Sequence, residues 1–144
     1  MQFLALIASI VSVFLSTYYS HLGIKTNVRP TLVFVYDPNS GWALRNVGRG
    51  PALNVLVAYR ESNTSEWQMP IRLYPLKNDD EIAVPWFGHD PEMLAVTYQD
   101  AHNAAYTSVC DNDLTTTYEG NRLPMWDERN IKKAWELPSS DAPR

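Results

Sequence analysis

The sequence predicts an all-β protein, an antiparallel β-sandwich carried on a single N-terminal transmembrane helix. Two observations predict this architecture. Residues 1–24 contain no Asp, Glu, Lys or Arg. After them come short runs rich in β-branched and aromatic residues, broken every 8 to 12 residues or so by Gly, Pro, Asn or Asp, which is the spacing of a sandwich.

Residues 1–24 are predicted to cross a membrane. From Phe3 to Tyr18 the chain is almost continuously apolar, and about 20 such residues at about 1.5 Å each span the roughly 30 Å bilayer core. A cleaved signal peptide is the alternative interpretation. No basic segment precedes the apolar run, however, and no A-x-A-like cleavage site follows it.

Residues 25–30 are expected to be a juxtamembrane linker. Lys25 and Arg29 lie in it, whereas no basic residue precedes the span. The positive-inside rule therefore places the domain on the cytoplasmic side of the membrane. We expect Lys25 and Arg29 to meet anionic lipid headgroups, each contributing about 1 kcal/mol. The single cysteine, Cys110, fits a reducing compartment.

The predicted span carries small residues along one face, at spacings of three and four. In lipid such a face allows a second helix to approach closely, and serine hydroxyls bond across the contact. We expect this stripe to pack on a partner helix, although Ala and Ser are also simply common in such helices. The stripe consists of Ala5, Ser9, Ser12, Ser16 and Ser20.

Residues 31–120 are assigned to the sandwich. Asp37 to Gly41 has turn chemistry and separates the first two strands as a hairpin. The predicted strands are Thr31–Tyr36, Trp42–Asn46, Leu53–Tyr59, Trp67–Leu73, Glu81–Val84, Met93–Tyr98 and Ala105–Val109.

Residues 121–138 are predicted to be an extension with a short helix. Asp127 is placed to cap this helix, Arg129–Trp135 to form it and Pro138 to end it. Residues 139–144 lack core residues and are expected to be a tail.

The most distinctive segment runs from Arg45 to Val55, Arg-Asn-Val-Gly-Arg-Gly-Pro-Ala-Leu-Asn-Val. Its glycines and asparagines suit a structural crossing between strands. The alternative is a nest of backbone N–H groups that binds an anion. The segment resembles the N-x-G-x-G-P-A-x-N-V motif of uncharacterised bacterial membrane-anchored proteins. In that family an N-terminal helix leads through a basic segment and Arg-Pro, here Arg29-Pro30, to an immunoglobulin-like β-sandwich. The resemblance implies that fold and a domain on the cytoplasmic side of a bacterial inner membrane, and it implies little about function.

No catalytic, cofactor or metal site is predicted. His89, Asp90, Asp100 and His102 lack the spacing of a metal site, and Cys110 with His102 lacks an orienting third residue. The net charge of −4, with no basic patch outside the juxtamembrane region, argues against nucleic-acid binding.

Aromatic residues and methionine outside the predicted core indicate a protein interface. The alternative is that these side chains cover the ends of the sandwich. The predicted interface residues are Trp86, Phe87, Met125, Trp126, Ile131 and Trp135.

Together these features predict a non-catalytic accessory subunit of a larger, hetero-oligomeric membrane complex. Integral membrane subunits and the bilayer are the expected partners. Energy-transducing assemblies, photosynthetic reaction centre–antenna or respiratory, are the kind of complex we expect. The alternative is an independent membrane-tethered binding or sensor module, with a site near Trp86 to His89. An enzyme would need His89, Asp90, Asp100 and His102 to converge in one cleft.

Overall fold

The computed structural model describes residues 2–88 and 93–137, and describes side chains for 5–23, 28–88 and 93–137. His89, Asp90, the tail at 139–144 and the Lys25 side chain lie outside these ranges.

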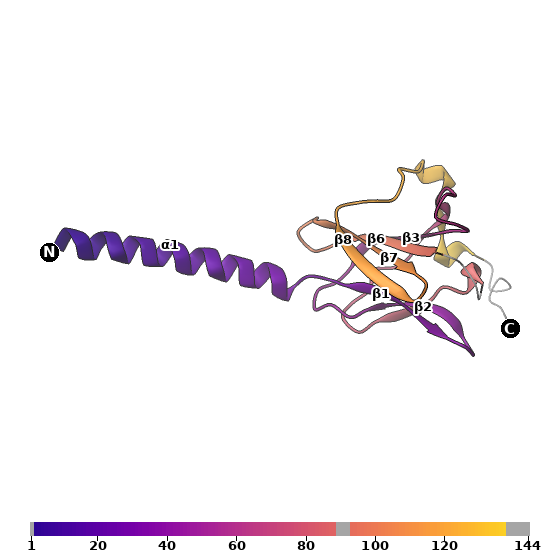
Figure 1. The fold of residues 1–144 in the computed structure, drawn as a ribbon, viewed down its shortest axis with the longest axis horizontal. Helices are drawn as coiled ribbons and strands as arrows, with labels where there is room; N and C mark the ends of the chain where they lie inside the picture. The colour runs from indigo at the N-terminus through magenta and orange to yellow at the C-terminus, as the bar shows by residue number, and fades with distance from the viewer. Residues whose placement is uncertain (1, 89–92, 138–144) are drawn as a thin grey trace.

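Helix α1 (Gln2–Asn27) extends away from the β-sheet part of the molecule along its long axis (Figure 1). The stretch Ala5–Gly23 has a mean hydropathy of 1.4, and none of it is buried. Its length and composition are those of a membrane span or of a signal sequence.

Two sheets follow the helix. The first has the order β1 (Leu32–Asp37), β2 (Gly41–Asn46), β5 (Glu81–Ala83). The second has the order β8 (Leu114–Glu119), β7 (Ala105–Asp111), β6 (Met93–Gln99), β3 (Leu53–Arg60), β4 (Gln68–Arg72), β9 (Lys132–Lys133). All neighbouring strands pair antiparallel except β4 and β9, which are parallel.

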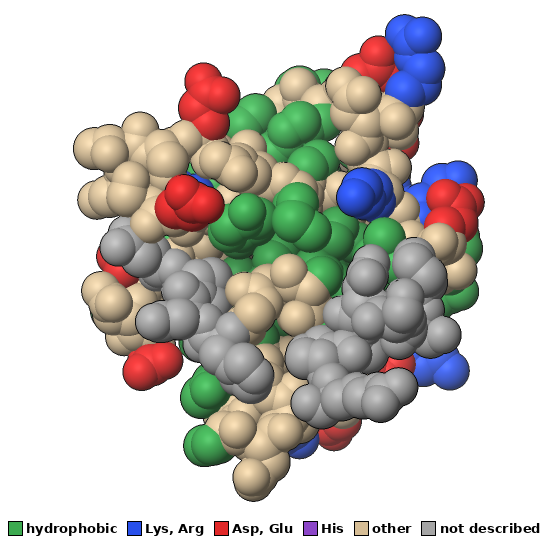
Figure 2. All heavy atoms as spheres, turned by 90° about the vertical axis from the view of Figure 1, so that its right-hand side faces the viewer, with side chains coloured by type: hydrophobic (Ala, Val, Ile, Leu, Met, Phe, Trp, Pro, Cys, Tyr) green, Lys and Arg blue, Asp and Glu red, His purple; other side chains and the backbone are tan. Residues whose placement is uncertain are grey.

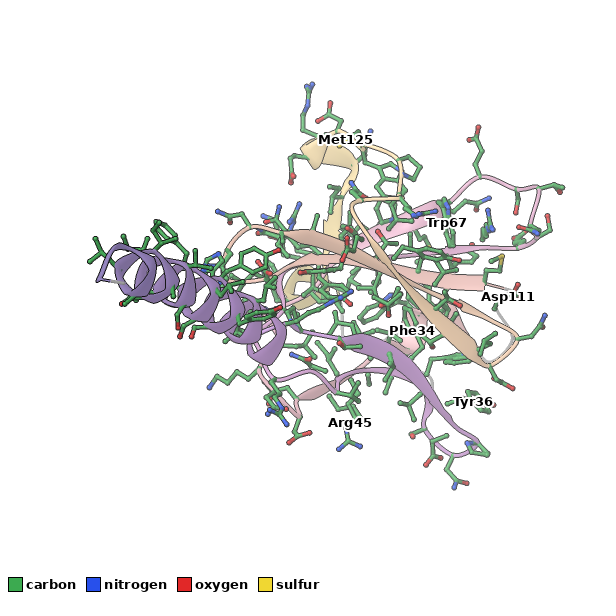
Figure 3. The ribbon with its side chains drawn as sticks, turned by 60° about the vertical axis from the view of Figure 1, so that its left-hand side comes forward. Phe34, Tyr36, Arg45, Trp67, Asp111 and Met125 are labelled. Carbon is green, nitrogen blue, oxygen red and sulfur yellow. The ribbon has the colours of Figure 1, made fainter. Side chains whose placement is uncertain are left out.

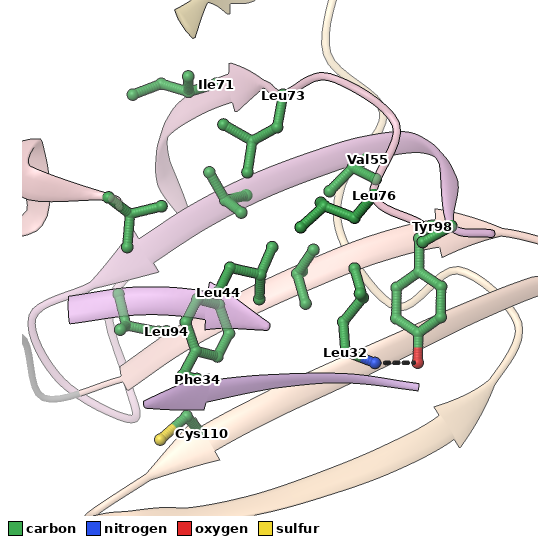
Figure 4. Close-up of a cluster of buried hydrophobic side chains, with 14 of the residues drawn as sticks. Leu32, Phe34, Leu44, Val55, Ile71, Leu73, Leu76, Leu94, Tyr98 and Cys110 are labelled. Carbon is green, nitrogen blue, oxygen red and sulfur yellow. Dashed lines mark hydrogen bonds between the residues drawn. The ribbon is translucent and has the colours of Figure 1, made fainter. Parts of the chain in front are cut away.

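The two sheets share one hydrophobic core. Leu32 and Leu44 from the first sheet pack with Val55 and Leu94 from the second, and all four are buried (Figure 4). The Tyr98 hydroxyl accepts a hydrogen bond from the Leu32 backbone N–H at 3.3 Å and so joins the sheets within this core. The mostly β fold with one N-terminal apolar helix is therefore as predicted.

The other face of the larger sheet is partly covered by the C-terminal extension. Ala58 and Ala95 follow core residues Val57 and Leu94 on their strands and so face the opposite side. Leu123, 6% exposed, packs on both alanines.

The predicted C-terminal α-helix is wrong. Within the described residues, 128–136 form two 3₁₀ turns, η2 (Glu128–Asn130) and η3 (Ala134–Glu136), with β9 between them. Asp127 does cap η2, accepting from the Arg129 backbone N–H at 3.0 Å. The extended Lys132–Lys133 pair bonds to β4, and this pairing excludes a continuous helix.

Candidate functional site

The chain leaving α1 is held by the loop between β2 and β3. Asn46, the last residue of β2, is fully buried beneath this loop. Its Oδ1 accepts hydrogen bonds from the backbone N–H groups of Thr31 (3.3 Å) and Gly48 (3.0 Å). Its Nδ2 donates to the carbonyls of Gly50 (2.8 Å) and Leu76 (3.0 Å). One side chain thus ties the helix exit, the loop and the strand connection at Leu76 together.

Backbone contacts complete this arrangement. We use the name helix-exit clamp for Asn46 and residues 47–50 together with residues 28–31, to which they are bonded. The Val47 N–H donates to the Thr31 carbonyl at 2.9 Å, and the Arg49 N–H to the Arg29 carbonyl at 3.2 Å. The approach is so close that a Cβ on Gly50 would overlap the Val28 carbonyl. Only a residue without a side chain fits there.

The clamp also bears on the anion-nest interpretation of the same loop. A nest needs successive backbone N–H groups directed at a ligand. The Gly48 N–H donates to Asn46, and those of Arg49 and Gly50 donate to the Arg29 carbonyl. These donors are used inside the fold, so the loop acts as a structural crossing.

Arg29, one of the predicted headgroup residues, lies beside the clamp. Its guanidinium carbon is 4.4 Å from the centroid of the Tyr106 ring. A guanidinium nitrogen is 3.9 Å from the Glu119 carboxylate, and both side chains remain accessible to solvent. The contact holds the cation at the end of the domain nearest α1 (Figure 1).

A cleft of about 410 Å³ opens at this end, lined by Arg29, Asp100, His102, Tyr106 and Glu119. Asp100, 5% exposed, is more deeply buried than Tyr106 at 9%. The Asp100 Oδ1 accepts from the backbone N–H groups of His102 (2.8 Å) and Ala104 (2.9 Å), and Oδ2 accepts from the Tyr106 hydroxyl (3.2 Å). Burial, and then the Asp100 charge, raise the pKa of Tyr106.

Among the described residues considered for catalysis or metal binding, Cys110 lies apart from Asp100 and His102. Asp100 and His102 share the β6–β7 turn, but the Asp100 carboxylate is occupied by that turn. Cys110 lies at the other end of β7, about 20 Å away along the strand. It is buried in the core, and burial raises its pKa. The part of the chain that the structure describes contains no His, Cys, Asp or Glu cluster able to hold a metal.

The predicted interface residues divide into buried and exposed groups. Phe87 is 7% exposed and packs on Tyr59 in the core, while Trp86 is half-buried beside it. Figure 2 shows the end opposite the helix, where apolar side chains occupy the centre. This is the distribution expected if aromatic residues cover the end of the sheets.

The C-terminal extension presents the exposed group. Met125 is 91% exposed and points away from the sheets (Figure 3). Trp135 is 43% exposed and stacks on Tyr74, with ring centroids 4.6 Å apart. Trp126 packs against the cluster of Ala58, Ala95 and Leu123, and Ile131 is half-buried.

The small-residue stripe of α1 is free of the domain. Ala5, Ser9, Ser12, Ser16 and Ser20 are all exposed. The same is true of the bulky side chains elsewhere on the helix, such as Phe14 at 73%.

The sequence interpretation did not single out Glu119, and it named Tyr106 as part of a predicted strand and not as a site residue. Both lie on the β7–β8 pair, and they face each other in its register. The run of threonines before Tyr118 has the β-branched composition of a strand and could have located this pair.

No protein family profile matches the chain, and no curated protein or solved structure matches it either.

Proposed function

We propose that the chain is a non-catalytic accessory subunit of a larger bacterial membrane complex. In this proposal α1 packs among partner helices, and the β domain lies on an extrinsic surface of the assembly. The observation that carries the proposal is the helix-exit clamp. Asn46 alone makes four hydrogen bonds across it, two of them to the loop and one to Thr31.

The clamp favours a subunit over a lone tethered domain for a mechanical reason. A tether needs only a flexible linker. Here the loop bonds directly to residues 28–31, which follow α1 without a spacer. A fixed exit direction is useful where helix and domain must both meet partners at once.

The same feature favours a retained anchor over a cleaved signal peptide. Signal peptidase acts on a small-residue site after the apolar segment. Here α1 continues through Asn27, one residue before the clamped Val28. The apolar face of α1 is exposed throughout Ala5–Gly23, which costs free energy in water and none in a bilayer.

We place the domain on the cytoplasmic side of the bacterial inner membrane, from Lys25 and Arg29 and the positive-inside rule. An immunoglobulin-like arrangement is part of the proposal. In its support, the chain crosses between the sheets after β2, after β4 and after β5, the kind of crossing that such sandwiches contain.

Two surfaces are proposed to contact partners: the small-residue stripe of α1, and Met125 with Trp135 on the extension. Leucine at both Ser9 and Ser16 fills the stripe without reducing hydrophobicity, so insertion is retained and close helix contact is lost. We expect this variant to lose its partners during mild-detergent purification from the native membrane.

The matched control exchanges Ile7→Leu and Val11→Leu on the bulky face of α1 and is expected to keep the partners. Retention of the same partners by the Ser9→Leu/Ser16→Leu variant would show that the stripe holds none of them. The proposal would then rest on the extension alone.

The second candidate function is an independent membrane-tethered binding or sensor module. A cleft of about 350 Å³ favours it, lined by Phe34, Tyr36, Trp42 and Asp113 away from the helix exit. Recovery of the protein alone from its membrane, without fixed-ratio partners, would favour this candidate.

A further inference from the structure

The cleft beside Arg29 has a defined depth relative to the proposed membrane span. The apolar stretch ends at Gly23, and Arg29 follows six residues later. The helix continues to Asn27 at about 1.5 Å per residue, and the two residues that follow it add at most about 3.4 Å each, so the Arg29 backbone lies no more than about 13 Å beyond the hydrocarbon core. The headgroup layer of each leaflet is about 5–8 Å thick. An anchored chain therefore holds this cleft close to the outer edge of the headgroup layer, within reach of a lipid headgroup.

The charges in the cleft favour a ligand of mixed charge. The Arg29 guanidinium is one cation, and Asp100 and Glu119 are two carboxylates. These three side chains together carry one net negative charge. Arg29 suits a phosphate, whereas the carboxylates repel a wholly anionic headgroup and attract an ammonium.

The contacts of these groups also distinguish between two kinds of zwitterionic headgroup, one that ends in a quaternary ammonium and one that ends in a primary ammonium. A quaternary ammonium is recognised by open aromatic faces, but Arg29 already lies over the Tyr106 ring. A primary ammonium instead needs hydrogen-bond acceptors for its three N–H groups. The Glu119 side chain is 83% exposed and supplies a carboxylate acceptor within 3.9 Å of the Arg29 guanidinium.

We propose that this cleft binds the headgroup of a phosphatidylethanolamine-type lipid, with the phosphate on Arg29 and the primary ammonium on Glu119. The volume of about 410 Å³ falls within the range of small-molecule sites, about 300–1,000 Å³. The proposal rests on the membrane-anchored function proposed above. It gives that anchor a lipid preference and fixes the domain against the bilayer surface.

The test uses the full chain in mild detergent, mixed with equal amounts of phosphatidylethanolamine, phosphatidylcholine and phosphatidylglycerol of identical acyl chains. Native mass spectrometry counts the lipid retained. We expect phosphatidylethanolamine to be retained in preference to the other two. Glu119→Gln is expected to reduce its retention about tenfold, because a charge-assisted hydrogen bond is lost. Equal retention of the three lipids, or no effect of Glu119→Gln, would overturn the proposal.

Asp79→Asn is the matched control, since Asp79 is an exposed carboxylate 4.0 Å from Arg45 that does not line the cleft. This variant is expected to retain the lipid like the unmodified chain. Flotation with vesicles tests the anchor separately. A chain that floats without lipid preference keeps the anchor and loses the headgroup site. A chain that does not float contradicts the proposed membrane anchoring. Lipid retention in detergent then still tests whether the cleft binds the headgroup.

Discussion

Gly50 and Val28 are in contact so close that a methyl group on Gly50 would occupy the space of the Val28 carbonyl oxygen. The contact joins the loop after β2 to the residue that follows α1. It explains why a glycine stands at this point of the Arg45–Val55 segment. The same contact makes the helix exit part of the folded domain.

The first prediction concerns this contact. Gly50→Ala is expected to destabilise the domain by about 1–3 kcal/mol, because overpacking forces the backbone apart. Urea unfolding of the full chain in detergent, followed by Trp fluorescence, measures the change. Gly23→Ala is the control, since a Cβ on Gly23 meets nothing within 4 Å. A Gly50→Ala variant as stable as this control would contradict the description of the clamp.

A second prediction separates the two halves of the Asn46 amide. Asn46→Asp keeps the shape and the acceptor but loses the donor to the Gly50 and Leu76 carbonyls. We expect a loss of about 2–4 kcal/mol, because buried carbonyls lose their partner and face a charge. Asn63→Asp, in an exposed turn, is expected to change stability by less than about 0.5 kcal/mol. The same unfolding assay compares them, and equal losses would argue against a special role for Asn46.

A third prediction concerns pH. Burial and the Asp100 charge raise the pKa of Tyr106 in the folded state above its ordinary value near 10. The stability from this shift is fully present below about pH 10 and is lost as the pH rises through the folded-state pKa. Tyr106→Phe is therefore expected to flatten the decline of unfolding free energy between about pH 9 and 11. If the unfolding free energies of the two proteins fall in parallel with pH, Tyr106 makes no pH-dependent contribution to stability.

Cys110 provides a fourth prediction. It is the only cysteine, it is buried, and burial raises its pKa. We expect alkylation at pH 8 to be slow in the folded chain and to accelerate in urea with the unfolding transition. Mass spectrometry of the alkylated fraction measures this directly. Rapid alkylation without urea would mean that the core around Cys110 opens readily.

A fifth prediction compares two neighbouring side chains of the C-terminal extension, the buried Leu123 and the exposed Met125. Leu123→Ala removes a buried contact with the larger sheet and is expected to cost about 2–3 kcal/mol. Met125→Ala alters a side chain that is 91% exposed and is expected to change stability by less than about 0.5 kcal/mol. Met125→Ala should nevertheless weaken partner retention if the extension is an interface. Unchanged retention would restrict the proposed interface to α1 and Trp135.

Much of the fold was predictable because its signals are local. The β1–β2 hairpin follows from turn chemistry, with the Asp37 carboxylate accepting from the Asn39 N–H at 2.7 Å. Strand β8 was missed because its threonines lack an alternating apolar pattern. Their β-branched composition was the available signal.

The errors arise where pairing is non-local. The spacing of Ile131, Ala134 and Trp135 suits a helix, yet Lys132–Lys133 pairs with β4, some 60 residues earlier in the chain. The glycines of the clamp were recognised as a crossing. Their contact with residues 28–31 could not be deduced, because it joins segments about 20 residues apart through close backbone packing and backbone hydrogen bonds, which leave no local pattern in the sequence.

We propose that the chain is a subunit of a membrane complex. The ratio of the chain to the proteins that purify with it tests this proposal most directly. The measurement is mild-detergent purification of the unmodified protein from its native membrane, with quantitative mass spectrometry of the proteins that accompany it. The proposal predicts a set of integral membrane proteins in a fixed ratio to this chain. Recovery of the chain alone, as a monodisperse single protein, would contradict it.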